Sequence, residues 1–589
     1  MAITMFKEVG YTLSKLLQDI EMGEIGLPEL QRPFVWPNTK VRDLFDSMYK
    51  GFPVGYLLFW ANGSGNGHKQ IGTGNKQKVP RLLIVDGQQR LTSLFAVINR
   101  IQVLRNNYDK EIIRIAFNPL TEFFDVSNAA IEKDSEFIPD ISVVWASEIG
   151  IFKLADAYLA RLRAAREASG KEVSEEEENK IKASINKLDN IEAFPFSVLE
   201  ITGNASEEQV AEIFVRVNSK GTPLNQADFI LTLMSVFWDQ GRFELEEFCR
   251  QTRVPPEKEA SAYNHFIQSD PDQLIRVEIG LGFKRARLKN VYNVLRGKDL
   301  DTGEFSDERR EQQFEVLKNA QSLMLNLQSW HDFHKCLIQA GYRSRDMITS
   351  DNSLLFAYVF YLIGKHEYKV PASILRKTIA RWFFMTSLTS RYSGSFESTM
   401  EQDLSRLRDI HNADEYISYL NRIISETLTD DYWSITLPNE LNTSSARTPV
   451  LFGYYAALNL LNAQVMFSSV RIPELLDPTI KANKAALERH HLFPKGYLAT
   501  IGIEEKRITN LLANYALVEW RDNIEISDKS PSEYVPQYEA NFSDKELKDM
   551  YLWHGLPAKW YEMDFNDFLL ERQKRIAKIT RIGFEKLRK

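Results

Sequence analysis

The sequence predicts a multidomain α+β protein, and three observations lead to this prediction. The chain has 589 residues, enough for roughly three or four domains of ordinary size. Its first 240 residues alternate short apolar runs with turn signals, whereas from about 245 to 445 the apolar residues recur at helical spacing. We therefore expect an α/β domain at 1–240, with a charged helical insertion at about 155–190, then a helical linker domain at 241–445 and a third domain at 446–589.

Short segments within these regions predict individual elements. VGYLLFW (54–60) and RLLIV (81–85) are apolar runs bounded by Gly, Pro or charge, which is typical of buried strands. SKLLQDIEMG and TSLFAVINRIQVL have helical spacing, so we expect a helix over each. In the middle region SLLFAYVFYLIGKH and ILRKTIARWFFMTSL predict two further helices.

Composition indicates an ordinary globular protein without a disulfide framework. Hydrophobic residues make up 44% of the chain and charged residues 26%. The two cysteines, Cys249 and Cys336, fit a reducing compartment, so we expect a cytoplasmic protein. The longest apolar stretch, VLFGYYAALNLLNAQVMF, contains Asn459, Asn462 and Gln464, which predicts a buried helix and no membrane span. The net charge of −7 gives no overall basic field, but a local basic patch is enough to bind nucleic acid.

The segment LLIVDGQQRLTSL predicts an anion site. A strand ends at Asp86, Gly87 permits an unusual backbone angle, and Gln88, Gln89 and Arg90 open a helix. The start of such a helix presents free backbone N–H groups and a positive dipole end, and an arginine adds a planar cation suited to phosphate. We expect a nucleotide phosphate to bind there. A plain strand–turn–helix, with Arg90 in a structural ion pair, explains the same pattern.

Two further segments hold polar residues at marked positions. In LPELQRPFVW, Gln31 and Arg32 lie between two prolines that favour extended backbone. In FVRVNSKGTPLNQADF, one helix ends and another begins across a polar corner that runs from Asn218 to Gly221. Aromatic packing in the first segment and an ordinary helix–turn–helix corner in the second remain alternatives.

The motifs QRPFVW, VDGQQRLTSL and FVRVNSKGTPL, in this order, resemble the N-terminal domain of GmrSD-type type IV restriction endonucleases. That domain is similar to the ParB/sulfiredoxin superfamily, whose members bind and often hydrolyse nucleoside triphosphates. The resemblance covers roughly the first 240 residues. It implies a nucleotide pocket lined by Gln31, Arg32, Asp86, Gly87, Gln88, Gln89 and Arg90 and closed by Asn218 and Gly221.

The segment ERHHLFPKGYL contains two adjacent histidines. AALERHH and YALVEW predict two strands joined by a loop, and a helix is expected to follow near Asp522. Adjacent side chains on a strand face opposite sides, so one of His490 and His491 can bind a metal while the other meets a water molecule. Asn523 offers an oxygen ligand at the helix start, and this ligand type suits Mg²⁺ or Mn²⁺. A histidine pair that is only a surface or capping feature is the alternative.

This strand–loop–strand–helix pattern resembles the HNH nucleases, and in particular the C-terminal ββα-metal HNH domain of GmrSD enzymes. The resemblance implies that His491 is the general base, that His490 and Asn523 hold the metal, and that Asn514 orients the catalytic loop. The family often has Asp or Glu before the catalytic histidine, where this chain has His490. That difference affects the preferred metal.

A basic segment near the C-terminus, ERQKRIAKITRIGFEKLRK, could contact DNA phosphates. We assign Arg572, Lys574, Arg575 and Lys578 to this contact, together with Lys495 beside the histidines. A solvated terminal helix is an equally good interpretation.

We therefore expect a nucleotide-regulated, metal-dependent HNH endonuclease of bacterial anti-phage defence that cleaves foreign, modified DNA. Its cofactors would be a divalent metal and a nucleoside triphosphate, which the N-terminal domain would hydrolyse. Its partners would be DNA and nucleotide but no membrane, and a homo-oligomer is left open. Two alternatives remain: a nucleotide-switched DNA-binding sensor with incidental cleavage, and an RNA-cutting toxin-like nuclease. The residues alone support a metal-dependent phosphodiesterase with an anion site.

Overall fold

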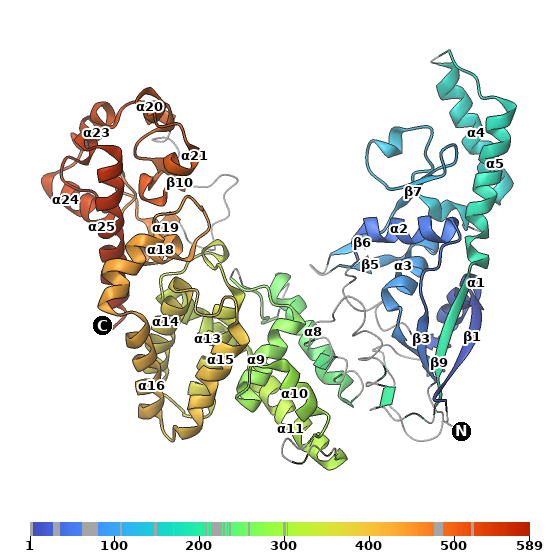
Figure 1. Ribbon diagram of the computed structural model, residues 1–589, viewed down its shortest axis with the longest axis horizontal. Helices are drawn as coiled ribbons and strands as arrows, with labels where there is room; N and C mark the ends of the chain where they lie inside the picture. Colours follow the sequence, from blue (N-terminus) through green and yellow to red (C-terminus); the bar gives the residue numbers. More distant parts are fainter. Residues whose placement is uncertain are drawn as a thin grey trace. The chain divides into compact units, whose positions relative to one another are not determined.

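Two compact units make up the chain, residues 1–224 and 225–589 (Figure 1). A small sheet organises the first unit, and the second is mostly helical. The predicted boundaries at 240 and 445 stay predictions. The structure is a computed structural model, and it describes residues 4–26, 34, 36–61, 81–105, 109–146, 150–168, 170–203, 205, 209–210, 213, 227, 230–231, 234, 237–256, 259–264, 266–298, 302, 304, 306–475, 487–519 and 524–588.

A five-stranded mixed sheet forms the centre of the first unit. Its strands are β1 (Phe6–Thr12), β2 (Ile25–Gly26), β3 (Leu57–Ala61), β4 (Leu82–Asp86) and β9 (Pro195–Ile201). They lie in the order β1-β9-β3-β4-β2. The pairs β1–β9 and β3–β4 are antiparallel, and the pairs β9–β3 and β4–β2 are parallel. The two strands predicted from VGYLLFW and RLLIV are confirmed as β3 and β4.

Three helices share one apolar core with this sheet: α1 (Leu13–Glu21), α2 (Asn38–Tyr49) and α3 (Gln88–Ile98). The helix predicted from SKLLQDIEMG is confirmed as α1. The helix predicted over TSLFAVINRIQVL is wrong in its second half. Arg100 has a φ of +52°, which ends helical geometry, and the chain continues as a strand.

Two small hairpins follow this break. The first consists of β5 (Gln102–Leu104) and β6 (Lys110–Ile112), and the second of β7 (Ile115–Asn118) and β8 (Phe123–Val126). Phe117 of β7 and Phe124 of β8 have ring centroids 4.6 Å apart. Both rings belong to the core that the helices share with the sheet.

The charged segment around 155–190 forms two helices, α4 (Ile151–Glu167) and α5 (Glu175–Asp189), which lie side by side in Figure 1. Ser174 caps α5 in a reciprocal pair of hydrogen bonds with Glu177. The facing sides of the helices bury a separate apolar cluster that includes Tyr158, Leu159, Leu162, Ile181 and Ile185. The polar sequence therefore forms a hairpin with its charged residues outward.

Helices dominate the second unit. The helices predicted from SLLFAYVFYLIGKH and ILRKTIARWFFMTSL are confirmed, and no helix among the described residues is long and apolar enough to cross a membrane. The helices are α8 (Asp239–Arg253), α9 (Pro271–Phe283), α10 (Leu288–Leu295), α11 (Asp307–Met324), α12 (Leu327–Gln339), α13 (Asp351–His366), α14 (Ala372–Leu388), α15 (Phe396–Ser405), α16 (Ala413–Thr427), α17 (Leu437–Glu440), α18 (Pro449–Leu461), α19 (Ile472–Leu475), α20 (Lys495–Thr500), α21 (Lys506–Thr509), α23 (Pro531–Glu539), α24 (Asp544–Trp553) and α25 (Phe565–Lys586).

The long helix α25 ties the C-terminal part of this unit to the helices before it. It lies against α18, the helix predicted to be buried, whose residues from Val450 to Asn459 are all buried. The ring of Phe584 in α25 lies 5.3 Å from that of Phe384 in α14. α25 thus packs against the helical region and also, through Phe565, Phe568 and Leu569, belongs to the apolar cluster that contains Leu492 and Phe493, the two residues after His491.

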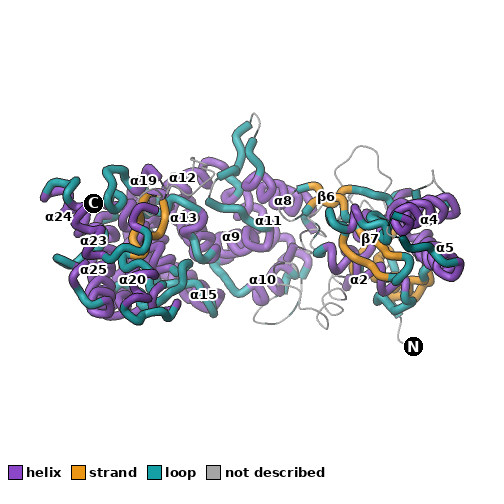
Figure 2. Tube along the Cα trace, turned by 90° about the horizontal axis from the view of Figure 1, so that it is seen from above, coloured by secondary structure: helices purple, strands orange, loops and turns teal. Residues whose placement is uncertain are grey.

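A two-stranded hairpin carries these histidines. It consists of β10 (Leu487–His491) and β11 (Tyr515–Glu519), which run antiparallel, and it stands out in Figure 2 as orange strands among helices near α20. Residues 524–526, beyond β11, are helical. The predicted strand–loop–strand order is confirmed, and α20, α21 and a short 3-10 turn (Leu512–Asn514) occupy the loop.

Candidate functional site

The hairpin places the two histidines on opposite sides of β10. His490 lies across from Ala516 and is 3% exposed, and its ring meets the ring of Tyr534 in α23 edge to face at 5.8 Å. His491 lies across from Tyr515, and the two ring centroids are 4.4 Å apart. His491 is partly exposed, so it is the histidine that a solvent molecule can reach.

Asn514 joins the two ends of the loop between the strands. Its side chain is fully buried, and its Oδ1 accepts a hydrogen bond from the Phe493 N–H at 2.9 Å. Its Nδ2 donates to the carbonyls of Phe493 and Thr509, both at 3.0 Å. The Leu492 N–H in turn donates to the Asn514 carbonyl at 2.8 Å. Asn514 thereby holds the chain just after His491.

The ring of His491 has a polar partner and a charged neighbourhood. Its Nε2 lies 3.0 Å from Oδ1 of Asn510. Burial lowers the pKa of His491, the Asn510 hydrogen bond raises it in part, and the charges of Lys495 and Arg489 lower it further. The ring is therefore neutral near pH 7, the form that can accept a proton.

The predicted metal site is only partly within the described residues. His490 supplies a buried imidazole, and Asn523 lies outside the described residues. Among the residues that the structure describes, no three His, Cys, Asp or Glu side chains gather to hold a metal ion.

In the first unit, the predicted strand–glycine–helix junction is present. β4 ends at Asp86, and Gly87 precedes α3 with a φ of +92° and no side chain to cap the helix. A Cβ at this glycine would lie 2.2 Å from Cδ2 of Leu57. The positive φ is the backbone geometry that glycine adopts without strain.

The guanidinium of Arg90 is bonded to backbone carbonyls of this same chain. Nη1 donates to the Val54 carbonyl at 2.5 Å, and Nη2 donates to the Tyr56 carbonyl at 2.7 Å. Nη2 also lies 3.4 Å from the Asp86 carboxylate. Burial lowers the pKa of Arg90, and Asp86 raises it in part. These contacts match the structural alternative and fix the segment before β3 against the start of α3.

The other residues of the predicted nucleotide pocket are described in part. Nε2 of Gln88 donates to the Ile84 carbonyl at 3.0 Å, and Oε1 of Gln89 accepts from the Trp36 N–H at 3.3 Å. The Gln89 contact brings Trp36, the last residue of LPELQRPFVW, to the start of α3. Four residues of the predicted pocket lie outside the described residues: Gln31, Arg32, Asn218 and Gly221.

The basic C-terminal helix corrects one prediction. Arg572 is 0% exposed, and it donates to the carbonyls of His554 at 3.0 Å and Ala513 at 2.6 Å, so the assignment of this residue to DNA contact is wrong. It faces the core because it occupies the apolar side of α25. Lys574, Arg575 and Lys578 are exposed, although Arg575 pairs with Glu571 at 3.0 Å. Lys495 is exposed at the start of α20.

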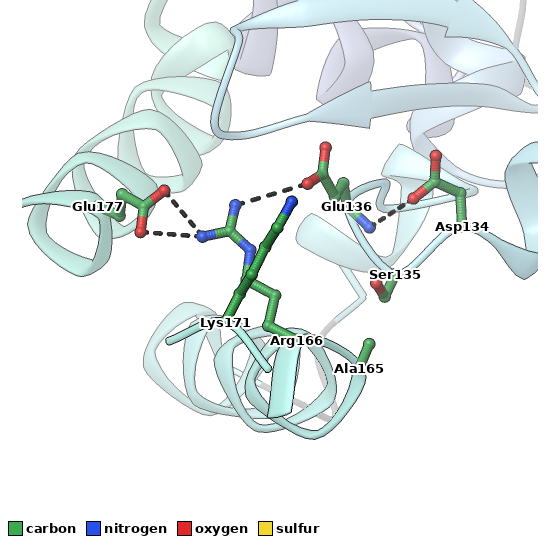
Figure 3. Close-up of a pocket in the computed structure, with 7 residues that line it drawn as sticks. All are labelled: Asp134, Ser135, Glu136, Ala165, Arg166, Lys171 and Glu177. Atoms are coloured by element: carbon green, nitrogen blue, oxygen red, sulfur yellow. Dashed lines mark hydrogen bonds and ion pairs between the residues drawn. The ribbon is translucent and has the colours of Figure 1, made fainter. Parts of the chain in front are cut away.

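A cavity of about 470 Å³ lies elsewhere in the first unit, between α4, α5 and the loop at 134–136 (Figure 3). Arg166 crosses it, with Nη1 at 2.8 and 2.9 Å from the two Glu177 carboxylate oxygens and Nη2 at 3.5 Å from Glu136. The carboxylates neutralise this arginine, so the cavity does not offer an anion site. None of the predicted site residues lines it.

Sequence reasoning missed two groups of residues. Asn510 and Tyr515 contact His491, but RITNLLANY gives no spacing signal that marks them. Val54 and Tyr56 bind Arg90 through backbone carbonyls, which any residue type supplies. Only Gly55 carries a sequence signal, because a Cβ there would lie 2.6 Å from Nη1 of Arg90.

Comparisons with known proteins connect these observations to a family. Residues 13–235 match the family model described as the N-terminal domain of the GmrSD restriction endonuclease. An uncharacterized protein of Methanocaldococcus jannaschii is 25% identical over 557 residues, which cover 89% of this chain and 86% of that protein. The family match includes the Gly87 junction and ends before the histidine hairpin. It supports a restriction endonuclease role in defence, with DNA as the partner.

Proposed function

We propose that the protein is a nucleotide-regulated, metal-dependent endonuclease of anti-phage defence that cleaves foreign, modified DNA. The observation that carries the proposal is the match of residues 13–235 to a restriction endonuclease domain. The histidine hairpin of the second unit supplies residues suited to phosphodiester hydrolysis. In this proposal the first unit binds and hydrolyses a nucleoside triphosphate with a ParB/sulfiredoxin-like fold, and the hairpin belongs to an HNH nuclease fold.

His491 is the proposed general base. It takes a proton from water, and the water oxygen forms a new bond to phosphorus. The bond from phosphorus to the leaving oxygen breaks with its electron pair, and that oxygen takes a proton from solvent. Asn514 supports this step because its side chain holds Phe493, in the chain that follows His491, through two hydrogen bonds.

His490 and Asn523 are the proposed metal ligands. The buried imidazole of His490, on the opposite side of β10 from His491, fits a role apart from the base. A bound Mg²⁺ or Mn²⁺ would polarise the scissile phosphate and stabilise the leaving oxygen. The exposed side chains of Lys495, Lys574 and Lys578 are the proposed DNA contacts.

The Gly87 junction is the proposed nucleotide site. Gly87 has a φ of +92° at the N-terminus of α3, and the following residues begin a helix whose N–H groups suit a phosphate. In this proposal Arg90 acts on the pocket mainly by holding the chain before β3, because its terminal nitrogens donate to the Val54 and Tyr56 carbonyls. Gln31, Arg32, Asn218 and Gly221 complete the proposed pocket.

A cleavage assay with the full chain tests the proposal. The substrates are unmodified, methylated, glucosylated-hydroxymethyl and phosphorothioate DNA and a matched RNA, with Mg²⁺ or Mn²⁺ and with or without each nucleoside triphosphate. We expect cleavage of one modified DNA, and a loss of roughly a hundredfold to ten-thousandfold in rate for His491→Ala. His411→Ala, which removes an exposed histidine of the same unit, is the matched control and should cleave normally.

Each other outcome favours a different function. Cleavage of RNA but not DNA would identify a toxin-like ribonuclease. Nucleotide-dependent DNA binding with a cleavage rate that His491→Ala leaves unchanged would identify a sensor. Cleavage that chelation of divalent cations does not reduce would remove the metal from the proposal.

A further inference from the structure

We propose that Asn510, held by the hydroxyl of Tyr515, is a positioning residue that fixes the ring tautomer of His491 and leaves Nδ1 as the atom that accepts the proton. The inference rests on the proposed function, in which His491 is the base. It adds an atom-level assignment and two residues outside the motif.

Oδ1 of Asn510 contacts both Tyr515 and His491. The Tyr515 hydroxyl donates to this oxygen at 3.0 Å, and Nε2 of His491 lies at 3.0 Å from it. An amide carbonyl oxygen accepts hydrogen bonds and cannot donate one. Nε2 of His491 must therefore carry the hydrogen, and the neutral ring then has its lone pair on Nδ1.

Tyr515 holds both the ring of His491 and the amide of Asn510. Its ring packs against the His491 ring with centroids 4.4 Å apart and an interplanar angle of 45°. The two residues are also direct partners in the strand register. The ring of Tyr515 thus limits the motion of the imidazole, while its hydroxyl limits the rotation of the Asn510 amide.

Hydrogen bonds also hold the backbone around Asn510. Its N–H donates to the Lys506 carbonyl at 3.2 Å, at the end of α21. The residue before it, Thr509, has its carbonyl bound by Nδ2 of Asn514 at 3.0 Å. The same asparagine that holds the chain after His491 therefore also holds the segment that carries Asn510, so the base and its partner are fixed by one side chain.

Cleavage kinetics test the positioning role with four variants. Asn510→Ala should lower kcat by roughly tenfold to a hundredfold, the range typical of removing the hydrogen-bond partner that orients a metal-bound histidine, with little change in KM. Asn510→Asp keeps an accepting oxygen and should recover most of kcat. Tyr515→Phe keeps the ring and should lose less than Asn510→Ala. Asn541→Ala, an exposed asparagine of the same unit, is the control.

A spectroscopic measurement tests the tautomer without reference to cleavage. The full chain is labelled with 15N-histidine and studied near pH 8.5, about two units above the ordinary pKa of imidazole, and the His491 signals are assigned from their absence in His491→Ala. We expect a protonated Nε2 in the wild type and in Asn510→Asp, and a mixture of tautomers in Asn510→Ala. Thermal unfolding of each variant checks that the fold is intact.

Two results would overturn the inference: a protonated Nδ1 in the wild type, or a tautomer and a kcat that Asn510→Ala leaves unchanged. A failure of the proposed function looks different. In that case the wild type cleaves no nucleic acid, while the 15N spectra still decide the tautomer.

Discussion

Asn514 is bonded to both backbone polar groups of Phe493: its Oδ1 accepts from the Phe493 N–H at 2.9 Å, and its Nδ2 donates to the Phe493 carbonyl at 3.0 Å. The two residues stand 21 positions apart, at either end of the loop that joins β10 to β11. The last register pair of the two strands is His491 with Tyr515. Beyond it, these side-chain hydrogen bonds hold the two chain segments together. They make the geometry after His491 depend on one buried side chain.

We expect Asn514→Ala to lower both stability and cleavage. The change leaves the Phe493 N–H and carbonyl without their partner in a buried place, which costs roughly 1–3 kcal/mol per unsatisfied group. Thermal unfolding should show a lower Tm, and the cleavage assay should show little or no activity. Asn541→Ala serves as the control on the surface. A wild-type Tm and normal cleavage in Asn514→Ala would show that the loop keeps its shape by other contacts.

We expect Arg90→Ala to weaken nucleotide binding through the shape of the pocket. The variant loses the hydrogen bonds to the Val54 and Tyr56 carbonyls, so the segment before β3 is no longer fixed to α3. Stability should fall by about 1–3 kcal/mol. Arg90→Lys should resemble Arg90→Ala, because a lysine cannot bind two carbonyls with a planar fork.

Calorimetric titration with each nucleoside triphosphate, together with thermal unfolding, measures both effects of Arg90. Arg163→Ala, on the exposed side of α4, is the control. Equal nucleotide affinity in wild type and Arg90→Ala would mean that the Gly87 junction is not the nucleotide pocket. Tight binding by Arg90→Lys with lost binding in Arg90→Ala would instead indicate that the charge of Arg90 acts on the phosphate directly.

The sequence predicted those features that depend on local patterns. Gly87 marked the strand–helix junction because its positive φ favours glycine. Apolar runs marked β3 and β4, which pair with each other in the sheet. The adjacent histidines and YALV marked the hairpin through strand alternation. The predicted metal ligand Asn523 and the predicted nucleotide residues Gln31 and Asn218 fall outside the described residues, so their roles stay predictions.

Other features depend on contacts that local patterns do not encode. Arg572 looked like one of several basic surface residues, but α25 turns it into the core, where backbone carbonyls 18 and 59 positions away accept its hydrogen bonds. The partner of His491 is Asn510, which is 19 positions away and has no motif of its own. Arg100 ended a helix whose apolar spacing continues without a break.

We expect Glu278→Leu to stabilise the second unit at pH 8. Glu278, in α9, is fully buried, and neither carboxylate oxygen has a hydrogen-bond partner among the described residues. Burial raises its pKa well above the ordinary value, so the folded state favours the neutral acid. The destabilisation that ionisation of Glu278 causes is therefore absent below about pH 4.5 and grows as pH rises toward the folded pKa.

Removing this buried polar group should raise the free energy of unfolding at pH 8 by about 1–3 kcal/mol. The gain in Tm should shrink when the comparison is repeated near pH 5. Glu311→Leu, at an exposed position of α11, is the control and should change Tm little at either pH. A lower Tm for Glu278→Leu at pH 8 would show that the carboxylate has a stabilising partner.

The opposite pH dependence is expected of His554, which follows α24. It is 1% exposed, and its Nε2 lies 3.1 Å from the Gln464 carbonyl, so it is held as a neutral donor. Burial and the charge of Arg572 lower the pKa of His554 to about 3, and the Gln464 contact raises it in part. Because the unfolded chain takes up this proton near pH 6.5, the stability is fully present above that pH and is lost as pH falls toward 3.

His554→Gln keeps a donor for the Gln464 carbonyl but does not titrate. Below about pH 6.5 the free energy of unfolding of the wild type should fall by roughly 1 kcal/mol per pH unit relative to that of His554→Gln. We therefore expect the Tm of the wild type to fall more than that of His554→Gln between pH 7.5 and pH 5. His411→Gln, at an exposed position, should follow the wild type. Parallel curves for all three proteins would mean that His554 becomes charged without opening its surroundings, and that the acid sensitivity of this unit arises elsewhere.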